Sequence, residues 1–86
     1  MDDIADHLVF LYGRSFGGKV KGRFRIANKL MRLLMKRKRL YESDVEILKK
    51  AMYERGYVLI DMDSFFVVLS ANMFVNYRRA NEECLV

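Results

Sequence analysis

Apolar residues recur at helical spacing within the first dozen residues of the chain. Their i, i+4, i+7, i+8 pattern predicts a short helix that Asp2 or Asp3 can cap, with a buried strand over residues 7–12 as the alternative. The apolar positions are Ile4, Leu8, Leu11 and Tyr12. A glycine-rich connection over residues 13–18 then separates this segment from the next.

A second helix is predicted over residues 23–36, where apolar side chains cover a broad arc when spaced at about 100° per residue. A surface helix needs a narrower arc than this. We therefore expect the second helix to be central to the core or to face a second protomer. The apolar positions are Ile26, Ala27, Leu30, Met31, Leu33, Leu34 and Met35.

The third helix carries the clearest local signals. Ser43-Asp44-Val45-Glu46 matches a capping box, in which the Ser43 hydroxyl accepts the N–H of Glu46 and the Glu46 side chain reaches back. Gly56 suits a left-handed position beyond the helix end, so we expect the helix to run through Arg55. The positions expected to face the core are Val45, Leu48 and Met52, and those expected to face away are Ile47, Lys50 and Glu54.

Two runs rich in β-branched and aromatic residues, 57–61 and 65–69, flank a polar turn and predict a β-hairpin. Adjacent strand residues point to opposite faces, so only one of Phe65 and Phe66 should enter the core. A last short helix is expected over residues 71–80, capped by Ser70 and with Met73, Phe74 and Tyr77 pointing inward. The predicted fold class is α+β, a single domain over residues 1–86 with three N-terminal helices, a β-hairpin and a short C-terminal helix.

This order of helix, helix, turn, helix and hairpin resembles the winged-helix DNA-binding superfamily. Residues 47–58, Ile-Leu-Lys-Lys-Ala-Met-Tyr-Glu-Arg-Gly-Tyr-Val, and the hairpin after them are similar to the end of its recognition helix and its wing. The resemblance is architectural, covers roughly residues 22–70, and implies a small winged-helix-like domain that binds DNA. One departure is that the third helix exposes Ser43, Glu46, Lys50 and Glu54, a more acidic face than a helix that reads the major groove usually has.

Charge is strongly segregated along the chain. Ten of the 16 Lys and Arg residues lie between Lys19 and Arg39, a stretch without Asp or Glu, whereas the formal net charge of the whole is only +5. Exposed helix faces normally mix both signs because like-charged neighbours repel. The segregation therefore favours an anionic partner, of which nucleic acid is the commonest for a small basic domain, over a merely solvated helix face.

Basic residues at i, i+4, i+7, i+11 and i+14 of the predicted second helix form one stripe that could follow a row of phosphates. The stripe consists of Arg25, Lys29, Arg32, Lys36 and Arg39. Supporting charges are expected from Lys19, Lys21, Arg23, Arg37 and Lys38, and a further contact from Lys50 on the third helix. The basic cluster at residues 36–39 has two other interpretations. Its charges could interact favourably with the dipole at the C-terminus of the helix, or they could form a localisation signal.

No catalytic or metal-binding constellation emerges. A Gly-x-x-x-x-Gly-Lys sequence is present, but Val20 follows it where a phosphate-binding loop needs Ser or Thr to hold magnesium. His7 and Cys84 are the only imidazole and thiol, too few for a zinc site. Asp61 and Asp63 are expected to bond the backbone of their own turn. We therefore expect no enzyme activity, no cofactor and no small-molecule substrate.

The predicted function is that of a non-enzymatic DNA-binding protein, a small transcriptional regulator or DNA-maintenance factor that binds double-stranded DNA as a homodimer. The alternative is an adaptor whose basic face binds an acidic protein. Membrane attachment ranks lower because the core should consume the apolar arc of the basic helix. A hydrophobic content of 52% argues against disorder. The acidic start of the chain and its lone cysteine favour a soluble cytoplasmic protein.

Overall fold

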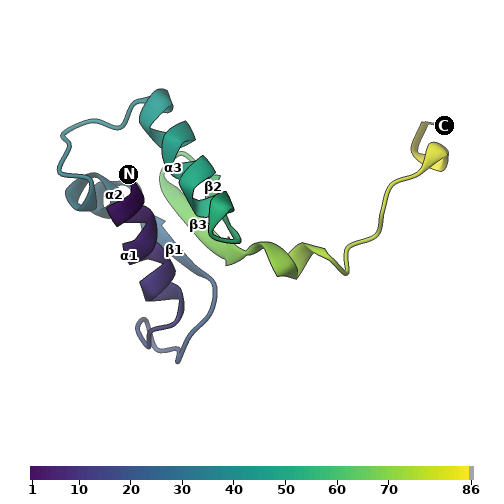
Figure 1. Cartoon of the computed structure of the whole chain (residues 1–86), viewed down its shortest axis with the longest axis horizontal. Helices are drawn as coiled ribbons and strands as arrows, with labels where there is room; N and C mark the ends of the chain where they lie inside the picture. Colours follow the sequence, from purple (N-terminus) through teal and green to yellow (C-terminus); the bar gives the residue numbers. More distant parts are fainter. Residues whose placement is uncertain (86) are drawn as a thin grey trace.

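The computed structural model describes residues 1–85 and contains both α-helices and β-strands (Figure 1). The elements are α1 (Asp2–Tyr12), β1 (Phe24–Ala27), α2 (Asn28–Leu34), α3 (Glu42–Glu54), β2 (Tyr57–Asp61) and β3 (Phe65–Ser70), followed by single 3₁₀ turns at Ala71–Phe74 and Glu82–Leu85. The predicted α+β class is confirmed as three α-helices and a three-stranded antiparallel sheet. The three helices are not consecutive, however, because a strand separates the first from the second.

That strand, β1, replaces the first turn of the helix predicted over residues 23–36. Its burial alternates, with Ile26 buried between exposed Arg25 and exposed Ala27. β1 pairs antiparallel with β3, placing Ile26 opposite Phe66, and β3 lies between β1 and β2. Pairing with a distant strand therefore overrides the helical periodicity of the local sequence.

The helix that remains, α2, has only seven residues. Met31 is its one buried side chain, while Leu30 and Leu33 are 53% and 64% exposed. The broad apolar arc was therefore a poor guide to burial. Its first members belong to a strand, and two of its leucines face solvent in this chain.

One hydrophobic core lies between the helices and a single face of the sheet. Figure 1 shows α1 and α3 crossing in front of the strands. The predicted core positions of α3 are confirmed, and Phe66 of β3 is 1% exposed. The buried core residues are Ala5, Leu8, Ile26, Met31, Val45, Leu48, Ala51, Met52, Leu59, Phe66 and Val68. Every α-helix and strand contributes at least one of them.

An arginine joins α1 to α3 at the edge of this core. The Arg55 Nε donates to Asp6 at 2.8 Å, a second guanidinium nitrogen lies 3.2 Å from Asp2, and Nη1 donates to the Ala51 carbonyl at 2.8 Å. The hydrogen bond to Asp6 raises the pKa of Arg55 above its ordinary value, with Asp2 acting in the same direction. Asp2 is thus an ion-pair partner within α1, and Met1 occupies the cap position expected for an aspartate.

The start of α3 differs from the predicted capping box. The cap lies two residues earlier than predicted, at Tyr41, which makes no side-chain hydrogen bond. The helix therefore begins at Glu42, and Ser43 lies inside its first turn. Instead, the backbone carbonyl of Tyr41 accepts a hydrogen bond from the N–H of Asp44 at 3.0 Å. The helix ends at Glu54, one residue before the predicted end, with Arg55 at the C-cap. Gly56 follows in the predicted left-handed conformation, with a φ of +82°.

Replacing Gly56 with alanine should lower the free energy of unfolding by about 1–2 kcal/mol, because an L side chain is strained at positive φ. For a domain of this size, that corresponds to a fall in Tm of roughly 4–16 °C in thermal unfolding followed by circular dichroism. Gly13→Ala is the matched control, since Gly13 ends α1 at a φ of −89°. Equal losses in the two variants would show that backbone strain at Gly56 is not the cause.

The β2–β3 hairpin is confirmed, but the C-terminal helix is not. At the hairpin tip, Asp61 Oδ1 accepts from the N–H of Asp63 at 2.8 Å, as expected for turn aspartates. Ser70 does act as a cap, accepting from the N–H of Asn72 at 3.3 Å, yet only a 3₁₀ turn follows. An isolated helix of this length is marginal in water without an apolar face to bury, and Tyr77 is 64% exposed. The chain beyond the turn leads away from the sheet (Figure 1).

Within residues 1–85, the helices are too short and too polar to traverse a bilayer.

Candidate nucleic-acid interface

The basic residues of the chain gather on connected elements around β1. From residue 14 to residue 39 there are eleven Lys and Arg and no Asp or Glu. We call this set the basic edge, because β1 is an outer strand of the sheet. Its members are Arg14, Lys19, Lys21 and Arg23 in the α1–β1 loop, Arg25 in β1, Lys29 and Arg32 in α2, and Lys36, Arg37, Lys38 and Arg39 in the α2–α3 loop.

The predicted stripe along one helix is wrong. Arg25 belongs to a strand, and only Lys29 and Arg32 belong to α2. Lys36 follows the end of α2 with a φ of +55°, and Arg39 lies further along the same loop. The five charges therefore come from a strand, a helix and a loop, and not from one face of a single helix.

Two arginines of the basic edge are held by the protein itself. Arg32 is half-buried, and its Nη1 donates to the Lys38 carbonyl at 3.2 Å, which braces the α2–α3 loop. Arg37 pairs with Asp44 of α3 at 3.5 Å. The other nine side chains are exposed and have no carboxylate partner among the described residues. They are therefore free to meet an anion.

A hollow of about 480 Å³ opens where α2 meets the α2–α3 loop. Asn28, Arg32, Lys38, Arg39 and Leu40 line it. The Nε of Arg32 is buried and lacks a hydrogen-bond partner there. Arg39 also stacks over the ring of Tyr41, with 5.9 Å from its guanidinium carbon to the ring centroid. This end of the basic edge therefore combines the hydrogen-bonded Arg32 with the exposed donors of Lys38 and Arg39.

The α1–β1 loop is more ordered than its glycines suggest. Backbone N–H and carbonyl groups of Phe16 and Lys19 bond each other in both directions at 3.0 Å. Gly17 and Gly18 form the two-residue tip, with φ values of +58° and +81°. The N–H of Gly22 donates to the Tyr12 carbonyl at 2.9 Å and closes the base of the loop. Sequence reasoning missed this small hairpin, although Gly-Gly between two other residues is a known hairpin signal.

Lys50 lies apart from the other predicted contacts. It lines a shallow hollow of α3 and β2 together with Glu46, Glu54 and Tyr53, and no residue of the basic edge lines that hollow. Its neighbour Lys49 pairs with Glu46 at 3.3 Å. The outer face of α3 therefore carries mixed charge, and it includes the acidic residues Glu46 and Glu54 that the sequence placed there. Ile47 and Tyr53 add exposed apolar surface to it, at 55% and 69% exposed.

The sheet face turned away from the helices adjoins the basic edge at Phe65. Phe65 is half-buried, opposite in direction to the buried Phe66, as predicted. The guanidinium carbon of Arg25 lies 5.4 Å from the centroid of the Phe65 ring, a cation–π contact. This contact fixes Arg25 over the sheet without neutralising its charge.

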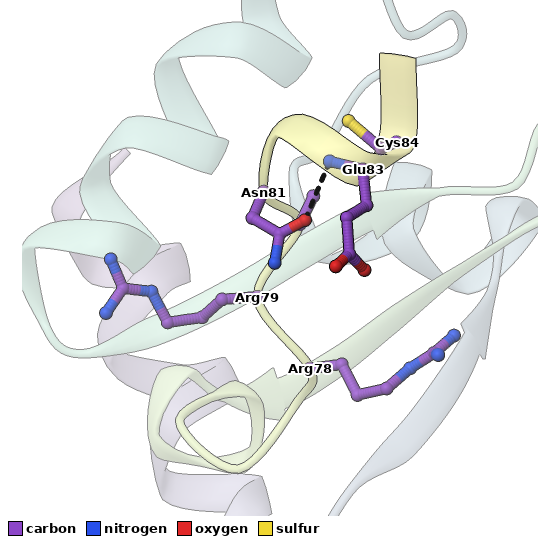
Figure 2. A pocket seen from close by; sticks show the side chains of 6 residues that line it. Arg78, Arg79, Asn81, Glu83 and Cys84 are labelled. Atoms are coloured by element: carbon purple, nitrogen blue, oxygen red, sulfur yellow. Dashed lines mark hydrogen bonds between the residues drawn. The ribbon is translucent and has the colours of Figure 1, made fainter. Parts of the chain in front are cut away.

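A further hollow, of about 650 Å³, belongs to the C-terminal segment alone (Figure 2). Figure 2 shows Arg78 and Arg79 pointing in different directions, while Asn81 accepts the N–H of Glu83 at 2.9 Å. All its lining residues are exposed, including the free thiol of Cys84. The hollow is a bend of an extended chain and offers no enclosed binding site.

His7 also lies on the surface, stacked against Phe10 with 6.2 Å between ring centroids. Among residues 1–85, no three side chains of His, Cys, Asp or Glu come together in a way that could hold a metal ion.

No protein-family model, curated protein or solved structure matches this chain.

Proposed function

We propose that this protein binds double-stranded DNA without catalysis, using the basic edge to contact phosphates. The observation that carries the proposal is the exposure of nine Lys and Arg side chains, without a carboxylate partner among residues 1–85, on contiguous elements from which acidic residues are missing. The positive charges of these side chains repel one another in the free protein. Each phosphate that they neutralise releases condensed counterions from DNA, which supplies favourable free energy.

The arrangement of α2, α3 and the β2–β3 hairpin supports a winged-helix-like domain as the carrier of this activity. In this proposal the protein is a small cytoplasmic transcriptional regulator or DNA-maintenance factor, and a homodimer would bring two basic edges to one duplex. Because the outer face of α3 is mixed in charge, affinity comes mainly from the basic edge. Phosphate contacts position a protein on DNA but do not read its sequence.

A salt series tests the proposal. Fluorescence polarisation with a short random duplex should give a log–log slope steeper than about −4, because at least four or five phosphates are engaged at roughly 0.9 counterion each. A slope shallower than about −2, with binding lost at physiological salt, would contradict it. Titration with a single strand of the same sequence provides the comparison for duplex preference.

The second candidate is an adaptor that binds an acidic protein. The exposed Ile47 and Tyr53 on α3 favour it, because apolar and aromatic residues are typical of the centre of protein interfaces. In that case an acidic protein, but not DNA, should remain bound at physiological salt. A pull-down with an acidic protein at that salt concentration distinguishes the two functions. Under the adaptor function, Ile47→Asp should weaken the capture, because it places a charge in the apolar part of the interface.

A further inference from the structure

The α1–β1 loop presents its charges from a closed backbone frame. Three backbone hydrogen bonds hold residues 12–22 in a small hairpin, two between Phe16 and Lys19 and one between Gly22 and Tyr12. The tip glycines have positive φ, and a Cβ built at either would meet nothing within 4 Å. The turn is therefore set by backbone conformation and not by packing.

An aromatic contact fixes this hairpin to the sheet. The rings of Phe16 and Phe24 meet edge to face, with 5.3 Å between their centroids. Phe24 is in β1 and packs against the hydrophobic core. The hairpin consequently has both an internal frame and an anchor on a rigid element, which is the arrangement that holds binding groups in place.

Basic side chains surround a hollow of about 440 Å³ at this site. Arg14, Lys19, Lys21, Arg23 and Arg25 line it, with Phe16 and Phe24 as the apolar part of its wall. No acidic side chain lines it, and the Arg14 guanidinium makes a cation–π contact with Phe10, with 5.7 Å from its carbon to the ring centroid. Five cations around one concavity concentrate positive potential there.

We propose that this hairpin, together with Arg23 and Arg25 beside it, is a preformed phosphate clamp, a defined DNA-contacting element within the basic edge. Its ligand is the phosphodiester backbone, which the clamp holds through guanidinium and ammonium donors on either side of the hollow. The proposal rests on the DNA binding proposed above. It adds that a defined loop geometry, and not net charge alone, contributes to affinity.

Preorganisation gives the proposal a charge-neutral test. The double variant Gly17→Ala, Gly18→Ala keeps every charge but strains the turn, which favours an open loop in the free protein. Binding must then also supply the free energy that closes the hairpin. We expect its Kd for a random duplex to rise at least fivefold at low salt. Circular dichroism should show an unchanged fold, because the tip is exposed and touches no core residue. Gly13→Ala, at a compatible φ, should bind as the wild type does.

A second pair of variants tests the charges themselves. Lys19→Ala, Lys21→Ala should make the log–log salt slope shallower by about 1.8, since each lost phosphate contact removes roughly 0.9. Arg78→Ala, Arg79→Ala removes the same charge from the C-terminal segment and should leave the slope within error of the wild-type value.

The outcomes separate this inference from the proposed function. Wild-type affinity in the Gly17/Gly18 variant would overturn the preformed clamp while leaving DNA binding intact. An unchanged slope in the Lys19/Lys21 variant would remove the hairpin from the interface, again with DNA binding intact. Failure of the wild-type protein to bind DNA would overturn both.

Discussion

The double variant Lys29→Glu, Lys36→Glu should bind a random duplex roughly 200-fold more weakly than the wild type at about 0.05 M salt, since each lost phosphate contact accounts for about 15-fold there. Both side chains are exposed and form no ion pair within the described part of the chain. The substitutions should therefore leave folding intact. Polarisation measurements over a salt series would show the loss and a slope shallower by about 1.8.

Position, and not only charge, decides the size of this effect. Arg78→Glu, Arg79→Glu imposes the same change in net charge on the C-terminal segment, away from the basic edge (Figure 1). We expect that control to lose less than about fivefold, because distant charges are screened beyond roughly 14 Å at about 0.05 M salt. Equal losses in the two double variants would mean that net charge drives binding, and the basic edge would not be the interface.

Replacing Phe66 with alanine should cost about 3–5 kcal/mol of folding free energy, because it removes a fully buried aromatic ring and leaves a cavity. A domain of 86 residues is stable by only about 4–13 kcal/mol. Phe66→Ala should therefore consume a large share of the stability. Urea unfolding followed by circular dichroism would show a much lower midpoint with a similar slope.

The adjacent Phe65 provides the matched control. It is half-buried on the opposite sheet face and loses only a cation–π contact with Arg25 and part of its burial when truncated. Phe65→Ala should cost about 1 kcal/mol, in line with exposed cation–π contacts and partial burial. Similar losses for the two variants would contradict the assignment of the core to the helix-covered face.

Signals carried by neighbouring residues predicted much of this fold. The β-branched and aromatic runs of residues 57–61 and 65–69, with a polar turn between them, predicted the hairpin, because a tight turn and its flanking strands are encoded within a few residues. The apolar spacing of α3 identified Val45, Leu48 and Met52 as core residues. Gly56 marked the end of that helix, since few other residues adopt its positive φ.

Local signals did not predict the secondary structure of residues 23–36 correctly. Phe24 and Ile26 satisfy a strand and a helix equally well over so short a stretch, and the choice depends on pairing with β3. Leu30 and Leu33 looked like core residues because periodicity cannot tell a buried apolar face from an exposed one. Similarly, nothing local showed that Met73 and Phe74 would end in a single 3₁₀ turn.

For the candidate site, the identities of the residues were predictable but their arrangement was not. A run without acidic residues is visible in the sequence, and all its Lys and Arg side chains are exposed except that of Arg32, which is half-buried. Their distribution over two loops, a strand and a short helix depends on tertiary structure. Lys50 was grouped with the others by its charge, although it shares its surroundings with Glu46 and Glu54 instead.

The position of β3 has a consequence for how the chain acquires its structure during synthesis. β3 is the central strand of the sheet but the last of the three along the chain. Neither β1 nor β2 has a hydrogen-bonded strand neighbour until residues 65–70 have left the ribosome. Pairing β1 with β3 also closes a loop that contains α2 and α3. Closing this loop costs conformational entropy before the contacts between the two strands can offset it. The domain should therefore fold in one late, cooperative step.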